Sequence, residues 1–107
     1  MATKYKELVK AATLTATATS LYTAPALTSA SIHAASVNNP TGAAVQVNFY
    51  KGAVGNATTR IAGKNVLANA TAQFPELVNH KLEPGTQIWA DGLACNVNVS
   101  GVEYVPE

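Results

Sequence analysis

Apolar and polar residues alternate with a period of two along much of the chain. The alternation is most regular over residues 45–50 and over residues 95–100. In the first stretch Val45, Val47 and Phe49 share one side, and the intervening residues share the other. Because successive side chains of an extended strand point to opposite faces, this pattern predicts β-strands with one face against a core.

Turn signals separate the alternating stretches, most clearly in the last quarter of the chain. Proline fixes φ and glycine accepts a positive φ, so Pro84-Gly85 predicts a turn. Asp91-Gly92 is a second turn signal and completes a predicted hairpin. Gly101 interrupts the final alternation, which predicts a β-bulge or a close approach of two backbones.

These signals recur roughly every 8–12 residues and leave room for about seven or eight short strands. No stretch after residue 12 has a convincing helical period. The pattern predicts an all-β fold, an antiparallel β-sandwich of the immunoglobulin-like or jelly-roll kind over residues 13–107. A small closed barrel is the alternative. The 107 residues suffice for one such domain.

The first twelve residues have a different pattern. Tyr5, Leu8, Val9 and Ala12 are spaced i, i+3, i+4 and i+7, which places them on one face of a helix. A helix this short is marginal in water unless it docks on something. We therefore expect residues 1–12 to be either a frayed terminus or an N-terminal arm that docks on a neighbouring subunit by its apolar face.

The small number of charged residues limits the classes of partner that the chain is expected to bind. Charged residues make up 12% of the chain and the net charge is +1, whereas charged residues are about a quarter of an ordinary soluble domain. This predicts a surface that meets other proteins, and the alternative is a small Thr/Asn-rich β-domain that stays folded with few charges by itself. The low net charge favours neither nucleic acid nor a membrane as a partner. The single Cys95 lies on the apolar side of a predicted strand, so we expect a buried, unreactive thiol. No signal peptide or membrane span is predicted.

The titratable residues do not suggest an enzyme. His33 and His80 lie far apart in the sequence, and a zinc site needs three or four ligands at recognisable spacings. No two acids alternate along a predicted strand, so no carboxylate pair is suggested. The acids are Glu7, Glu76, Glu83, Asp91, Glu103 and Glu107. We expect no catalytic residues, no metal and no cofactor.

Trp89 allows two interpretations. It alternates with Ile88 and Ala90, so it either marks an exposed contact surface or caps one end of the core. If Trp89, Tyr50 and Tyr22 were exposed together, they would form a carbohydrate-binding surface.

Several motifs resemble those of small β-sandwich structural proteins encoded by tailed bacteriophages and prophages. The resemblance covers about residues 13–105, and Thr86 departs from it where Asp is common. The motifs are Leu21-Tyr22-Thr23-Ala24-Pro25, Val45-Gln46-Val47-Asn48-Phe49-Tyr50, Leu82-Glu83-Pro84-Gly85 and Ser100-Gly101-Val102-Glu103.

The resemblance implies a non-enzymatic virion component assembled in the cytoplasm of the host bacterium. A capsid decoration (cement) protein is the preferred role, and a tail or fibre protein or a carbohydrate-binding module is the alternative. The expected partners are the major capsid protein, copies of the chain itself (for example as a trimer), or both. The candidate contact residues are Tyr5, Leu8, Val9 and Trp89.

Overall fold

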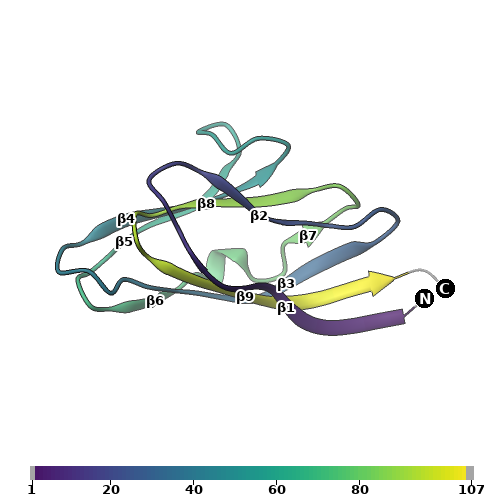
Figure 1. The fold of residues 1–107 in the computed structure, drawn as a ribbon. Helices are drawn as coiled ribbons and strands as arrows, with labels where there is room; N and C mark the ends of the chain where they lie inside the picture. The colour runs from purple at the N-terminus through teal and green to yellow at the C-terminus, as the bar shows by residue number, and fades with distance from the viewer. Residues whose placement is uncertain (1, 106–107) are drawn as a thin grey trace.

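Two antiparallel sheets packed face to face form the fold in the computed structural model, which describes residues 2–105 (Figure 1). The five-stranded sheet has the order β1 (Ala2–Thr13), β9 (Asn96–Val105), β3 (Ser29–Asn38) and β6 (Thr71–Gln73), with β7 (Lys81–Leu82) also paired to β3. The four-stranded sheet has the order β2 (Thr19–Thr23), β8 (Gln87–Asp91), β4 (Val45–Gly52) and β5 (Arg60–Val66). One 3₁₀ turn, η1, spans Pro75–Leu77.

The predicted all-β sandwich is therefore confirmed, and the strand order is that of a jelly roll. Six of the eight connections between the described strands cross from one sheet to the other. Among residues 2–105, β4 and β5 are the only consecutive strands paired by hydrogen bonds, so the predicted hairpin of the last quarter is wrong: β8 and β9 lie in different sheets. Closing the chain in this way places its first and last strands, β1 and β9, next to each other. Two facing sheets wound by crossing connections distinguish a jelly roll from the immunoglobulin-like alternative.

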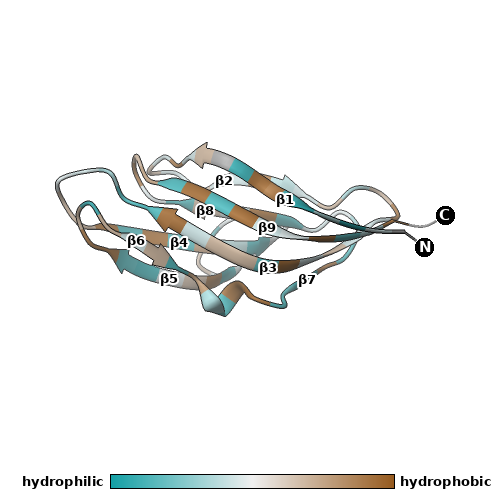
Figure 2. Cartoon of the chain, turned by 90° about the horizontal axis from the view of Figure 1, so that it is seen from below, coloured by the Kyte–Doolittle hydropathy of each residue, from teal (hydrophilic) through white to brown (hydrophobic). Residues whose placement is uncertain are grey.

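The core fills the space between the two sheets. Figure 2 shows apolar and polar residues alternating along the strands, as the sequence predicted. Phe49 of β4 packs edge to face on Phe74, with ring centroids 4.8 Å apart, and both rings are fully buried. The other large, fully buried side chains are Ile32, Leu77, Leu82, Ile88, Val37, Val47, Val66, Val97, Val99 and Val102.

The predicted helix over residues 1–12 is wrong, because this segment is strand β1. It pairs with β9 from Ala2 to Thr13 and has register shifts between Glu7 and Val9 and between Val9 and Ala12. These irregularities let two consecutive side chains, Leu8 and Val9, both enter the core. Two adjacent buried residues break the period of two, which is why the spacing imitated a helical face.

The boundary predicted at residue 12 is not visible in the strand pairing. β1 continues past it to Thr13, where the Thr13 hydroxyl donates a hydrogen bond to Asn96 Oδ1 at 2.9 Å. The division into an arm (residues 1–12) and a domain (residues 13–107) stays a hypothesis about assembly. Met1 lies outside the described residues.

The turn at Pro84-Gly85 and the close approach at Gly101 are confirmed. Gly85 has φ 87°, and the N–H of Thr86 donates to the Glu83 carbonyl at 2.9 Å. A Cβ on Gly101 would lie 2.1 Å from the carbonyl oxygen of Ser31, so no side chain fits there. Glycine is required at this position because β3 and β9 approach too closely for anything larger.

Candidate interaction surfaces

The structure separates the three candidate contact residues of β1. Tyr5 is 77% exposed, and its ring lies 6.4 Å from the ring of His33 on β3. Leu8 and Val9 are buried in the core at 7% and 4% exposure. The structure does not bring the three onto one exposed face, so only Tyr5 is available to a partner while β1 stays paired.

Trp89 lies on the outer face of the four-stranded sheet, because its neighbours Ile88 and Ala90 point into the core. The loop after β4 partly covers it. Its indole N–H donates to the Gly52 carbonyl at 3.1 Å, and a Cβ on Gly55 would lie 2.9 Å from Trp89 Cβ. Trp89 is thus half-buried and holds this loop against the sheet. It was predicted either to be exposed as a contact surface or to cap one end of the core, and it does neither.

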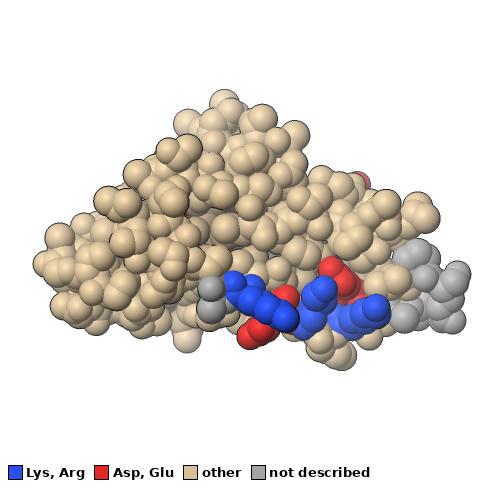
Figure 3. Space-filling model, in the orientation of Figure 1, with Lys and Arg blue, Asp and Glu red and all other residues tan. Residues whose placement is uncertain are grey.

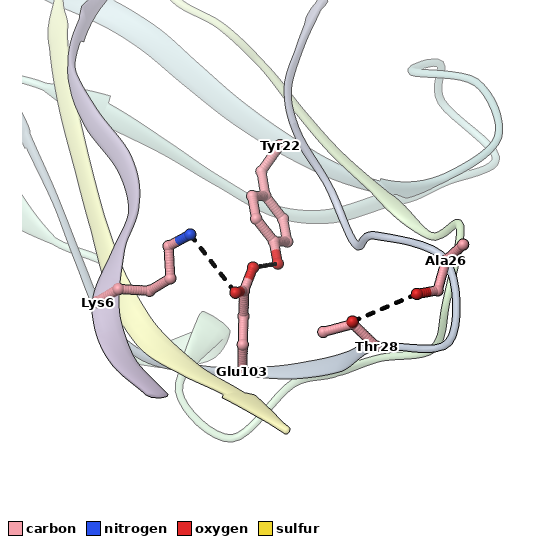
Figure 4. A network of polar contacts seen from close by, with 5 residues as sticks. All are labelled: Lys6, Tyr22, Ala26, Thr28 and Glu103. Atoms are coloured by element: carbon pink, nitrogen blue, oxygen red, sulfur yellow. Dashed lines mark hydrogen bonds and ion pairs between the residues drawn. The ribbon is translucent and has the colours of Figure 1, made fainter. Parts of the chain in front are cut away.

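Of the three aromatic residues suggested for carbohydrate binding, Tyr50 and Trp89 are cross-strand partners on β4 and β8, but neither presents a fully exposed ring. Tyr50 is 7% exposed, and its hydroxyl donates to the Asp91 carboxylate. Burial first, and then this carboxylate, raise the pKa of Tyr50. Tyr22 packs against the core, and its hydroxyl donates to Glu103 of the other sheet (Figure 4). Sugar rings stack on exposed aromatic faces, which this arrangement does not supply.

A polar network that the sequence analysis missed joins three strands inside the sandwich (Figure 4). Glu103 of β9 is 5% exposed and accepts a hydrogen bond of 2.5 Å from the Tyr22 hydroxyl of β2. Lys6 Nζ of β1 lies 3.5 Å from the other carboxylate oxygen. Burial first, and then the bond to Glu103, raise the pKa of Tyr22. The sequence contained the signal, because Glu103 continues the inward positions of Val97 and Val99.

A second polar chain runs over the outer face of the four-stranded sheet. The Gln46 amide donates to Asn48 at 3.1 Å, and the Asn48 amide donates to Asp91 at 3.0 Å. The Tyr50 hydroxyl completes the set of bonds on Asp91. These bonds give Asp91 a structural role, because its two carboxylate oxygens already accept hydrogen bonds from two residues of the neighbouring strand β4.

Lysines gather along one band of the surface. Lys4, Lys6 and Lys10 all belong to β1, and Glu7 lies between them. Figure 3 shows this charged band, while most of the rest of the same face carries no charge. As a helix, residues 1–12 would group Lys4, Lys6 and Lys10 on one polar face; as strand β1 they lie in a row along the edge of the sheet instead.

An open groove of about 370 Å³ lies beside η1 on the five-stranded sheet. Small and polar residues line much of it, among them Ser36, Ser100 and Asn98, together with Glu7 and His33. The groove is open, and its lining mixes polar and apolar groups.

The described residues show no group of three or more His, Cys, Asp or Glu that could hold a metal. Cys95 is fully buried, and burial raises the pKa of its thiol. Burial first, and then the charge of Lys51, lower the pKa of His80, whose Nδ1 lies 3.4 Å from Lys51 Nζ.

Between residues 2 and 105, no helix has the length and apolar character to cross a membrane.

Comparisons with known proteins bear on the fold. No protein-family model matches the sequence, and no curated protein matches it. Among solved structures, the fold is similar to that of a chain from Bacillus endospore appendages, which form a novel family of disulfide-linked pili. The two chains are 18% identical, the match covers 98% of this chain and 89% of the other, and the TM-score is 0.58. At this identity the likeness supports the β-sandwich alone.

Proposed function

We propose that this chain is a non-enzymatic structural protein of a bacteriophage virion, a decoration protein that binds the outer capsid surface and stabilises the head. Support comes from the motifs of residues 13–105, which resemble those of phage β-sandwich proteins. The observation that carries the proposal is the distribution of charge. Apart from the lysine band of β1, most of the face seen in Figure 3 carries no charge.

A surface with few charges favours contact with protein. Charged residues make up about a quarter of an ordinary soluble domain, and they keep copies of it apart and hydrated. This chain has 12% charged residues overall. Burying such a surface against a neighbour costs little desolvation of charge, as expected of a subunit that is covered by the capsid or by sister copies.

Exposed leucines on three loops also favour a protein contact. Leu27 follows β2, Leu67 follows β5 and Leu93 follows β8, and their exposures are 79%, 65% and 61%. Leu27 has φ 61°, a left-handed conformation that is unfavourable for a bulky side chain. A strained backbone that holds an apolar side chain in water is typical of a site selected for contact rather than for stability.

A second candidate is a subunit of a tail, fibre or other filament. The similar solved structure belongs to disulfide-linked pili, and this is the observation that favours a filament. The only cysteine of this chain, Cys95, is buried. A filament of this chain would therefore need non-covalent contacts. A carbohydrate-binding module has weaker support, because Tyr22 and Tyr50 are engaged with carboxylates.

Immunogold electron microscopy with an antibody against the purified protein tests the proposal on particles from the source lysate. Gold spread over the heads is the expected result. Gold confined to tails or fibres would replace decoration with the second candidate, and gold on no particle would overturn both. Particles that lack the protein should also release their genome at a lower temperature, and adding the purified chain back should restore their stability.

The contact role of Leu27 has a sharp test. Asparagine tolerates the left-handed conformation better than leucine, so Leu27→Asn should stabilise the isolated chain by about 1 kcal/mol. The same substitution should weaken binding to particles. Leu67→Asn is the matched control for stability, because it removes an exposed leucine without relieving a positive φ and should therefore not stabilise the chain. A Leu27→Asn chain that binds as tightly as the natural one would remove Leu27 from the contact.

A further inference from the structure

Strand β1 has a long free edge. It is the terminal strand of the five-stranded sheet, and within residues 2–105 its only strand neighbour is β9. It has 12 residues, whereas the other edge strands β2, β5, β6 and β7 have 5, 7, 3 and 2. The side chains of residues 3–7 are exposed. A long uncovered edge presents unpaired N–H and C=O groups to which another strand can add.

The lysines of β1 act against pairing of this edge with a second copy. Antiparallel pairing of two β1 strands centred on Glu7 would place Lys4 opposite Lys10 and Glu7 opposite Glu7. Pairing centred on Tyr5 would place Lys4 opposite Lys6, and pairing centred on Lys6 would place two copies of Lys6 together. Like charges directly opposite each other destabilise paired strands, so these registers all oppose self-association through β1.

We propose that the free edge of β1 binds an extended acidic segment of a partner protein, which adds to the five-stranded sheet as an additional strand. The same lysines that repel a second copy would lie beside carboxylates of the added strand. Opposite charges across neighbouring strands are stabilising. This inference goes beyond the proposed function, because the edge would recruit such a segment in a head, a tail or any other assembly.

The lysine band of β1 is narrow, and this favours a single acidic strand as its partner over a membrane surface or a nucleic acid. Lys4, Lys6 and Lys10 form one line on one strand, and the net charge of the whole chain is only +1. A membrane surface or a nucleic acid backbone would engage a wide basic face. Lys6 is also held at 3.5 Å from the buried Glu103, so Lys4 and Lys10 supply most of the charge that a partner would meet.

The test uses the full chain and a fluorescent synthetic peptide as long as β1, in which Glu alternates with Val and Thr. Titration followed by fluorescence anisotropy measures the affinity. Two control peptides are needed: one with Lys in place of every Glu, and one with the same glutamates but proline in place of Val and Thr. The proline peptide has the same charge but lacks the N–H groups that alternate positions of an added strand donate.

We expect the acidic peptide to bind at least about tenfold more tightly than either control, which corresponds to about 1.4 kcal/mol. Hydrogen exchange should slow at β1 amides when the acidic peptide is bound, because an added strand hydrogen-bonds to them. Lys10→Glu should weaken this binding about tenfold. Arg60→Glu, on edge strand β5 of the other sheet, is the matched control and should leave it unchanged.

Four results would each overturn the proposal. Equal binding of the proline peptide would mean charge attraction without strand addition. Binding of the lysine peptide as tight as that of the acidic peptide would mean that the lysine band of β1 does not favour negatively charged strands. Absence of binding at 1 mM acidic peptide would mean that the edge accepts no such strand. A dimer of the free chain whose β1 amides are already protected would mean that a second copy occupies the edge.

Discussion

Two tyrosine–carboxylate pairs in this molecule look alike and occupy different environments. In one pair Tyr22 of β2 donates to Glu103 of β9, across the space between the two sheets. In the other pair Tyr50 of β4 donates to Asp91 of β8, its neighbour in the four-stranded sheet. Glu103 is 5% exposed, whereas Asp91 is only partly buried on the outer face.

The difference shows what a polar pair contributes when backbone pairing is absent. β4 and β8 are already joined by a ladder of backbone hydrogen bonds, so the outer pair adds to an existing connection. β2 and β9 lie in different sheets and share no backbone hydrogen bonds, so the inner pair connects two strands that backbone pairing does not. Through Lys6 the same carboxylate also contacts the first half of β1, the strand that carries the free edge.

The largest difference should appear when each carboxylate is removed. Glu103→Ala should destabilise the fold by about 2–3 kcal/mol, because it leaves the Tyr22 hydroxyl without its acceptor in the interior. Asp91→Ala should cost about 1 kcal/mol, since water can reach the outer face. Urea denaturation measures both. Equal losses would contradict the distinction between the two sites.

Removing only the hydroxyl groups should give a smaller difference of the same sign. Tyr22→Phe should cost about 1.5–2 kcal/mol, because a hydrogen bond to a charged, nearly buried carboxylate is lost. Tyr50→Phe should cost about 0.5–1 kcal/mol, since Asp91 keeps its bond from Asn48. A Tyr50→Phe chain less stable than Tyr22→Phe would reverse the comparison.

Alkaline pH should reduce the stability contributed by the inner pair more than that contributed by the outer pair. Folding raises the pKa of Tyr22 above its ordinary value of 10.0 through burial and Glu103. A raised pKa contributes stability that is complete below pH 10 and is lost as pH rises toward the folded-state value. The stability gap between the natural chain and Tyr22→Phe should therefore narrow above pH 10. It should narrow less for Tyr50→Phe, because Arg60 and Asn48 partly offset the rise at Tyr50. A gap that stays constant to pH 11.5 would contradict this.

The smallest effect should come from the partly exposed lysine of the inner network. Lys6 is 46% exposed and 3.5 Å from Glu103, so Lys6→Met should cost about 0.5 kcal/mol and the loss should shrink in high salt. Hydrogen exchange should nevertheless become faster at amides of residues 3–7, because this contact holds them near β9. Unchanged exchange there would mean that backbone pairing alone holds the first half of β1.

Local patterns were sufficient for much of the fold and for little of the candidate site. The strand at residues 45–50, the Pro84-Gly85 turn, the buried Cys95 and the crowding at Gly101 were all predicted and are confirmed. Each depends on a residue and its near neighbours. The error at β1 arose where a change of register buries Leu8 and Val9 together, because that change is set by the partner strand.

Local patterns were enough to predict an all-β sandwich, since alternation, turn chemistry and glycine requirements act over a few residues and survive in any arrangement of the strands. Which strands form the edges of the sheets depends on the folded arrangement, and this arrangement places the lysines of β1 along a free edge. It also decided that Tyr22 reaches Glu103, 81 residues away along the chain. Such contacts depend on how the two sheets are wound together, which no local spacing records.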